Sequence, residues 1–326
     1  MKRASLVTAA ILLAFVAIAG WTGWWFFLAT YGQRMAASGA EPTAEPKLAY
    51  AEIERFGFPF VVGLRLRDVK LAARFLDGTA HGTAPILELT ARPWRPMDIA
   101  IQLPYGLGYS VTGQNRFSGE ARLASGTAAS KPAPAVALIL TDVSARPPSS
   151  APILARHGRI DWRRKPDGTA GLDLAFADLT LAENALFGPA AKRLETNLTL
   201  HGDLPVTGLP ADIQAWRNAE GRIDIDAARV EWGALDLIAD GKLGLDAAYR
   251  LTGGVNLKVG NGAAAIGRLK SIGVLDAGGA IAANAYLAFG ALASGGRAVA
   301  PVIFADGEAS LAGFPIARLD PVCDCR

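Results

Sequence analysis

The chain has 326 residues, of which 51% are hydrophobic, and its formal net charge is +3. This charge is too small and too dispersed to indicate a nucleic-acid-binding protein, which would concentrate Lys and Arg on one face. The glycines follow no collagen-like period, and no long block of like charges predicts disorder. The composition favours a folded protein with many turns, large enough for one large or two ordinary domains.

The N-terminus carries a candidate membrane anchor. After Lys2 and Arg3 the next charged residue is Arg34, and residues 6–28 between them are almost all apolar. A hydrocarbon core needs about 20 such residues in a helix, because lipid offers no partner to backbone amides. Aromatic residues crowd the C-terminal end of the segment, as in an interfacial belt. The side chains expected to contact lipid are Leu6, Ile11, Leu12, Leu13, Phe15, Ile18, Trp21, Trp24, Trp25, Phe26 and Phe27.

The two basic residues at the start predict the orientation of this anchor. Lys2 and Arg3 should stay in the cytoplasm, so that the rest of the chain lies on the far side of the membrane. The alternative is a cleaved signal peptide with a small-residue site at residues 38–40. Signal peptides have apolar regions of about 7–15 residues close to the cut, whereas bulky aromatics and Arg34 intervene here. We therefore expect an uncleaved anchor, and both alternatives place the bulk of the chain in the same compartment.

Proline-bearing residues 33–46 are predicted to link the anchor to a β-rich region. The helix should end before Pro42, because proline cannot continue it. The expected organisation has four parts. They are a cytoplasmic stub and anchor at 1–32, the linker, a β-rich domain at 47–322 that could divide near 200–220, and a tail at 323–326.

Alternating apolar and polar residues predict strands through most of the domain. The first long strand, within residues 64–75, contains a slip in the alternation at Asp68 that indicates a bulge or turn. Residues 125–134 have the composition of a loop. The clearest pattern covers residues 222–259, where turns recur every 8–12 residues, as in an antiparallel meander.

Helices should be few and short in the domain. Residues 211–219 are predicted to form one, with Trp216 on its apolar side, and residues 282–293 another. A last hairpin is expected to turn at Asp306-Gly307. The fold class is therefore mainly β, an antiparallel curved sheet or sandwich with meander connections, plus an N-terminal transmembrane helix and a few short helices.

The sequence contains no convincing catalytic or cofactor-binding pattern. It lacks a Gly-x-Ser-x-Gly elbow, a His-Glu-x-x-His pair and a phosphate-binding loop with its lysine. We expect no metal and no cofactor. An enzyme would require a cleft that gathers distant residues, such as His157, Asp161 and Arg163 with another carboxylate.

The only cysteines are Cys323 and Cys325, at the extreme C-terminus. A bridge between them is possible in an oxidising compartment, but it would close a very small loop and add little stability. We expect a tail with an optional disulfide, and the alternative is a redox or thiol-anchoring role.

Two short segments resemble a family of uncharacterised proteins from Gram-negative bacteria, domain of unknown function 2125. One is Phe56-Gly57-Phe58-Pro59-Phe60, and the other begins at Val230, includes Trp232-Gly233 and continues to residue 246. The residues that carry the resemblance are Gly57, Phe58, Pro59, Phe60, Trp232, Gly233, Gly241 and Asp246. A weaker resemblance to AsmA-like proteins implies a periplasmic β protein tethered to the inner membrane and concerned with envelope lipids. It implies no catalytic residue.

The expected function is that of a non-enzymatic envelope protein, single-pass in the bacterial inner membrane, with its bulk in the periplasm. Its partners would be membrane lipids and not nucleic acid. A strongly curved sheet could leave an apolar face open to lipid, although an ordinary closed core is the favoured expectation. The alternative is an assembly factor that binds another envelope protein through an exposed sheet edge.

Overall fold

The computed structural model describes the chain apart from residues 1, 42–43, 45, 76–77, 114–115, 132, 149–150, 203–209, 272–296, 312–313 and 323–326. Its helices are α1 (Lys2–Gly39), α2 (Pro210–Asn218) and α3 (Gly262–Ser271). Its strands are β1 (Lys47–Ala49), β2 (Glu52–Phe56), β3 (Val62–Phe75), β4 (Gly78–Arg92), β5 (Arg95–Leu103), β6 (Leu107–Val111), β7 (Phe117–Ala129), β8 (Ala135–Arg146), β9 (Ile153–Arg164), β10 (Ala170–Thr180), β11 (Ala190–His201), β12 (Arg222–Trp232), β13 (Leu235–Leu245), β14 (Leu251–Gly260), β15 (Ala298–Ala305), β16 (Glu308–Leu311) and β17 (Phe314–Arg318).

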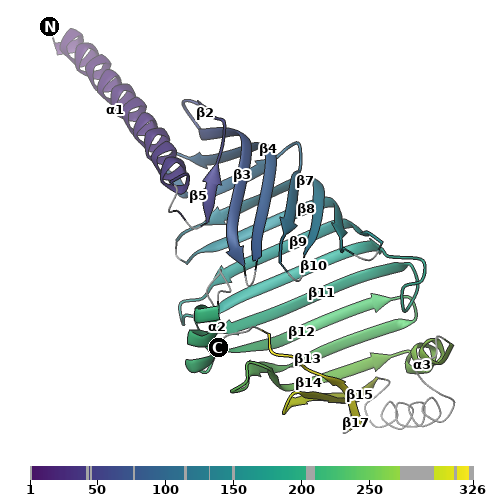
Figure 1. Ribbon diagram of the computed structural model, residues 1–326. Coiled ribbons are helices and arrows are strands. Elements are labelled where there is room, and N and C mark those ends of the chain that lie inside the picture. Colours follow the sequence, from purple (N-terminus) through teal and green to yellow (C-terminus); the bar gives the residue numbers. More distant parts are fainter. Residues whose placement is uncertain are drawn as a thin grey trace.

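The helix α1 projects from one edge of the β domain (Figure 1). Its 38 residues extend roughly 57 Å at 1.5 Å per residue. Leu13 and Phe15, in its N-terminal half, are each 74% exposed. Within the described part of the chain, α1 is the one helix long and apolar enough to cross a membrane. It also occupies residues 33–39, the first half of the expected linker, so little chain separates it from β1.

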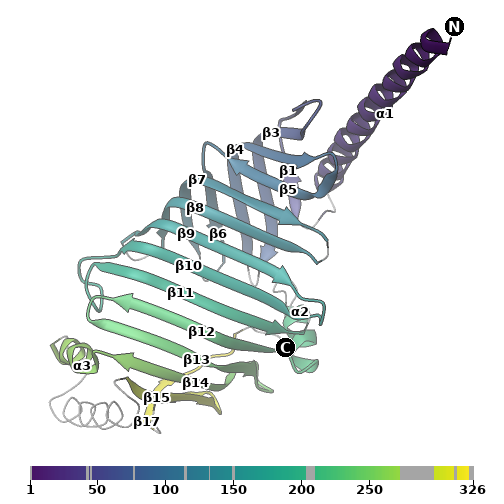
Figure 2. The same ribbon diagram turned by 180° about the vertical axis from the view of Figure 1, so that it is seen from behind.

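The strands form one antiparallel sheet. From β7 to β17 each strand pairs with the next along the chain, and this order is visible from behind in Figure 2. The meander predicted over residues 222–259 is confirmed as β12, β13 and β14. The sequence allows a division of the domain near residues 200–220. However, β11, before this region, pairs with β12, after it, along most of its length, so one sheet includes the strands on both sides.

A line of interrupted pairing, here named the crease, crosses the first half of the sheet. Two short strands share the outer edge of β3, with β2 pairing before Asp68 and β1 after it. Likewise β5 and β6 both lie between β4 and β7, separated by residues 104–106. The β3–β4 ladder is interrupted at Asp68 and Pro85, with the same register on both sides.

The crease continues through β7 to β11, again without a change of register. Each of these strands has one residue that drops out of pairing with its neighbours. The residues are Arg122, Asp142, Arg156, Asp178 and Lys192. The predicted slip at Asp68 is thus one member of a row of interruptions that extends from β3 to β11.

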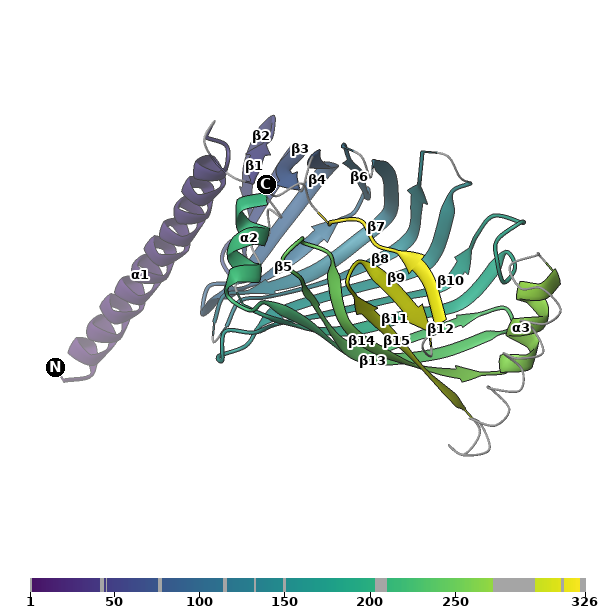
Figure 3. The same cartoon turned by 60° about the horizontal axis from the view of Figure 1, so that its bottom comes forward.

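Three aspartates give the crease its backbone geometry. Asp68, Asp142 and Asp178 have positive φ angles of 51°, 50° and 53°, a left-handed conformation that aspartate tolerates better than most residues. Such residues bend a strand locally. Figure 3 shows the described strands as one strongly curved layer. Of the two expected arrangements, a curved sheet and a sandwich, the described strands form the curved sheet.

Several local predictions can be compared directly with the structure. The helix over residues 211–219 is confirmed as α2, and Trp216 is buried and donates from Nε1 to the carbonyl oxygen of His201 at 2.7 Å. The hairpin turn at Asp306-Gly307 is also confirmed. The loop over residues 125–134 is wrong in its first half, because residues 125–129 pair with β5 and β8. The helix expected at 282–293 lies outside the described residues.

Candidate functional site

Three indole hydrogen bonds join the helix α1, the candidate membrane anchor, to the β domain. Nε1 of Trp21 donates to the carbonyl oxygen of Pro59 at 3.0 Å, and Nε1 of Trp25 to that of Val61 at 2.8 Å. Nε1 of Trp24 donates to the carbonyl oxygen of Pro93 at 2.9 Å. Of the three, Trp25 is buried, and a buried indole usually has such a partner. All three partners are backbone groups of two turns. These turns are residues 57–61, between β2 and β3, and residues 93–94, between β4 and β5.

Apolar packing reinforces this attachment. Trp25 is only 3% exposed, and Ala29 is fully buried in the same cluster with Val62. One turn further along the helix, a Cβ atom placed on Gly32 would lie 2.8 Å from Cδ1 of Leu64. A glycine at this position therefore lets the helix approach β3 closely. The aromatic residues expected only to face lipid also hold the helix against the protein.

An apolar groove of about 660 Å³ lies between α1 and the first strands of the sheet. One wall is the helix, from Trp24 to Ala36, and the other comes mainly from β3, β4 and β5. The lining residues are Trp24, Phe27, Leu28, Tyr31, Gly32, Met35, Ala36, Leu48, Val62, Leu64, Leu66, Leu87, Leu89, Thr90, Ala91, Pro96, Met97, Ile99 and Ser130. No side chain among them carries a charge, so the groove suits an apolar ligand.

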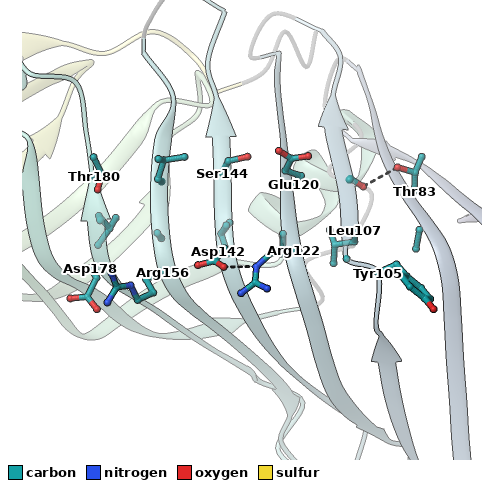
Figure 4. Close-up of a pocket in the computed structure, with 18 of the residues that line it drawn as sticks. Thr83, Tyr105, Leu107, Glu120, Arg122, Asp142, Ser144, Arg156, Asp178 and Thr180 are labelled. Atoms are coloured by element: carbon teal, nitrogen blue, oxygen red, sulfur yellow. Dashed lines mark hydrogen bonds and ion pairs between the residues drawn. The ribbon is translucent and has the colours of Figure 1, made fainter.

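A second, larger cavity of about 1380 Å³ follows the crease. Figure 4 shows Arg122, Asp142, Arg156 and Asp178 at one level on neighbouring strands, with the signs of charge alternating. The Nε atom of Arg122 lies 2.6 Å from Oδ2 of Asp142. This cavity is therefore lined by charges that partly compensate one another.

The far end of the crease is also internally compensated. Nζ of Lys192 lies 3.2 Å from Oε2 of Glu231, and this hydrogen bond holds the pKa of Glu231 below its ordinary value. Flanking apolar residues of the main core, such as Val143, Ala155 and Leu179, are buried. Charged side chains along the crease therefore find partners in one another. This arrangement does not indicate a particular ligand for the cavity.

The later family-like residues have structural roles in turns and, at Gly241, in the pairing of β13 with β14. Gly233 has a φ of +55°, and a Cβ there would lie 1.9 Å from the carbonyl oxygen of Phe187. Beside it, Nε1 of Trp232 donates to the carbonyl oxygen of Gly188 at 2.7 Å. A Cβ on Gly241 would lie 2.3 Å from the carbonyl oxygen of Gly254 on β14. These residues hold the loop after β10 and the β13–β14 pair in place.

Asp246 organises the turn between β13 and β14. Its Oδ1 accepts hydrogen bonds from the amides of Ala248 at 2.8 Å and Arg250 at 2.9 Å. Its Oδ2 accepts from Nε of Arg250 at 2.9 Å. Burial alone would raise the pKa of Asp246, but the hydrogen bonds from Arg250 and Ala248 outweigh it and lower the pKa.

The earlier family-like residues lie at the anchor. Gly57 has a φ of +92°, and its carbonyl oxygen accepts from the amide of Val61 at 2.9 Å, which closes the turn. The peptide bond between Phe58 and Pro59 is cis. Phe58 packs edge-on against Trp25, with ring centroids 5.5 Å apart. This motif therefore forms a turn against which α1 packs.

The residues considered for an enzyme, His157, Asp161 and Arg163, line neither of the two cavities. Asp161 pairs with Arg159 on its own strand, and Arg163 lies 3.1 Å from Asp173 on β10. His157 stands in β9 opposite Thr141 and Ala177. Among the described residues, no group of three or more His, Cys, Asp or Glu side chains could hold a metal. Cys323 and Cys325, and the side chains of Leu6 and Ile11, lie outside the described residues.

Comparison with known proteins places the chain in a family without supplying a function. No curated protein and no solved structure matches it. A family model described as an uncharacterized protein conserved in bacteria, DUF2125, matches residues 25–320. The match begins at Trp25 and includes the turn at residues 57–61 and the sheet up to residue 320. The chain therefore belongs to the DUF2125 family of bacterial proteins.

Proposed function

We propose that this protein is a non-enzymatic, single-pass protein of the bacterial inner membrane that binds the acyl chain of a membrane lipid. Lys2 and Arg3 would lie in the cytoplasm and the β domain in the periplasm. The observation that carries the proposal is the apolar groove, one wall of which is the helix that would cross the bilayer. A lipid could therefore enter from the membrane without crossing water.

The size and chemistry of the groove support an acyl chain as ligand. Its volume of about 660 Å³ lies within the range of roughly 300–1,000 Å³ that is usual for ligand pockets. Each methylene group that leaves water for an apolar site contributes about 0.8 kcal/mol. The lining supplies few polar groups that could bind a sugar or a peptide, and its three hydroxyl side chains, Tyr31, Thr90 and Ser130, are uncharged. A role in envelope maintenance through lipid binding or transfer follows from this.

The direct test is to fill the groove. Ala91 lines it, and Ala91→Trp in the full chain should occupy the space of an acyl chain. The wild type, purified in a mild detergent, should carry lipid that mass spectrometry identifies, and the variant should carry at least several-fold less. Ala137→Trp is the matched control, because this half-buried alanine of β8 lines neither cavity.

Two results would count against the proposal. Equal lipid on Ala91→Trp and on the control would exclude the groove as the lipid site. A stoichiometric envelope protein that copurifies without lipid would instead favour the assembly-factor alternative, in which a partner strand adds to an exposed sheet edge.

A further inference from the structure

The two turns that hold the anchor helix also expose large aromatic side chains. Phe58 is 52% exposed and Phe60 is 69% exposed in the turn at residues 57–61, although the backbone beside them is fixed by the indoles of α1. Trp94, at the tip of the turn between β4 and β5, is 56% exposed. An exposed cluster of this kind on a rigid support marks an interaction surface.

The contacts of these side chains fix their level along the helix. Trp94 stacks on Trp21 with ring centroids 6.3 Å apart. Phe58 lies 5.5 Å from the ring of Trp25 and 6.3 Å from that of Phe26. The exposed rings of Trp94 and Phe58 thus stand beside residues 21–26 of α1, and the backbone on both sides of Phe60 is bound at the same level.

The length of helix that is free of these contacts places this level at the surface of the bilayer. Residues 4–20 lie between Arg3 and the first docked indole, and they extend only about 26 Å at 1.5 Å per residue. The hydrocarbon core is about 30 Å thick. If α1 crosses the hydrocarbon core from Arg3 onward, residues 21–26 lie at the outer boundary of the core. Aromatic side chains are most favourable at this interface.

Two arginines complete this surface. Arg92 and Arg95 flank Pro93 and Trp94, and both are exposed. Within the described part of the chain, neither has an acidic partner within ion-pair distance. Residues 57–61 and 92–97 include no Asp or Glu. Guanidinium groups bind phosphate with paired hydrogen bonds, so this pair is suited to the level of lipid headgroups.

We propose that residues 57–61 and 92–95 form a second membrane contact, separate from the transmembrane span, whose partner is the phospholipid of the bilayer that α1 crosses. Phe58, Phe60 and Trp94 lie among the headgroups and outermost acyl carbons, and Arg92 and Arg95 bind lipid phosphates. This contact fixes the tilt of the β domain and keeps the groove under α1 open to the membrane. It rests on the proposed function only in requiring that α1 spans a bilayer.

Depth measurements on the full chain test this contact. The chain with Cys323→Ser and Cys325→Ser would carry one spin label, at Phe60→Cys or Trp94→Cys, in nanodiscs of zwitterionic phospholipid with a quarter anionic phospholipid. The control label is Ile139→Cys on β8, an apolar residue of similar exposure, at 57%, away from both turns. Labels at Phe60 and Trp94 should collide several-fold more with oxygen, relative to a water-soluble nickel complex, than the label at Ile139.

A second variant tests the arginines separately. In the variant with Arg92→Gln and Arg95→Gln, the label at Trp94 should collide less with oxygen relative to the nickel complex, because it lies closer to water. Its depth should also no longer depend on the anionic lipid. Both residues are exposed, so thermal unfolding of the variant should match that of the parent chain.

Two outcomes would overturn the proposal. One is a label at Phe60 that is as accessible to the nickel complex as the label at Ile139. The other is dipolar broadening between Phe60 labels, which would show that a second copy of the chain covers the aromatic cluster. Lipid in the groove is measured independently by mass spectrometry, so failure here is distinct from failure of the proposed function.

Discussion

Nε1 of Trp25, in the helix α1, donates a hydrogen bond to the carbonyl oxygen of Val61 at a distance of 2.8 Å. The bond joins the apolar segment to the first turn of the β domain, 36 positions further along the chain. The helix is therefore part of the folded structure as well as a candidate anchor. Cleavage at residues 38–40 would remove one wall of the groove and leave its apolar lining exposed.

Trp25→Phe should loosen this attachment while leaving most of the ring packing. The carbonyl of Val61 would lose its indole donor, which costs about 1 kcal/mol. Hydrogen exchange of the peptide covering residues 57–66, in detergent, should speed up several-fold, while exchange in β12–β14 stays unchanged. Phe27→Leu is the matched control, because Phe27 is exposed and its side chain has no hydrogen-bonding group. Equal exchange in the two variants would contradict the importance of this hydrogen bond.

The sequence predicts the elements of this structure better than it predicts their arrangement. The apolar run, the meander over residues 222–259 and the turn at Asp306-Gly307 are local patterns, and each is confirmed. Asp68 also disturbs the alternation visibly. Its alignment with Asp142 and Asp178 depends on the register of many hairpins, and single-strand periodicity does not contain that information.

The candidate site was harder to predict for a related reason. An aromatic cluster at the end of an apolar helix indicates a membrane interface, whatever the rings also contact. Nothing in the local sequence indicates that Trp24 binds the carbonyl oxygen of Pro93, 69 positions away. Groove residues such as Leu89 and Ile99 fit an ordinary buried strand face equally well. Their role follows only from the position of the helix, which tertiary packing decides.

The crease should depend on the backbone conformation of its aspartates. Asp142 has a φ of 50°, which β-branched residues adopt only with strain. Asp142→Val should therefore reduce the free energy of unfolding by about 1–3 kcal/mol. Asp142→Asn should cost much less, because asparagine also tolerates the left-handed region. Urea denaturation at pH 7 measures both values.

A neighbouring position provides the control for this experiment. Thr141 precedes Asp142 in β8 and pairs normally with His157. Thr141→Val should have only a small effect, because valine suits an extended strand. If Asp142→Val proved as mild as Thr141→Val, the left-handed residue would not determine the bend of the strand.

A similar argument applies to Gly233, where the obstacle is a neighbouring backbone atom. A Cβ there would lie 1.9 Å from the carbonyl oxygen of Phe187. Neither the turn at Gly233 nor the segment at Phe187 can move away without disturbing the loop before β11. Gly233→Ala should lower the midpoint of urea denaturation and shift the fluorescence of Trp232. Gly168→Ala is the control, because it also has a positive φ, of 84°, but no atom lies within 4 Å of its Cβ position. Equal effects would assign the cost to φ alone.

The turn at Asp246 should make stability depend on pH in a defined direction. Its pKa in the folded state is lowered against the effect of burial by the hydrogen bonds from Arg250 and Ala248, and so lies below the unfolded value of about 3.9. The folded state therefore binds this proton less readily than the unfolded state does. The stabilisation is fully present above pH 3.9 and is lost as the pH falls through the folded pKa.

Asp246→Asn should remove this contribution at neutral pH. We expect a loss of about 1–2 kcal/mol at pH 7, since hydrogen bonds to a charged acceptor are among the stronger ones. The difference from the wild type should shrink as the pH falls below about 3.9, because the unfolded carboxylate then takes up a proton that the folded carboxylate binds less readily. Urea denaturation at pH 7, 5 and 3 measures the trend. Asp98→Asn, at an exposed aspartate of β5, is the control. A deficit for Asp246→Asn that stays constant at all three pH values would show that the amide disturbs the geometry of the turn, and that the charge contributes little.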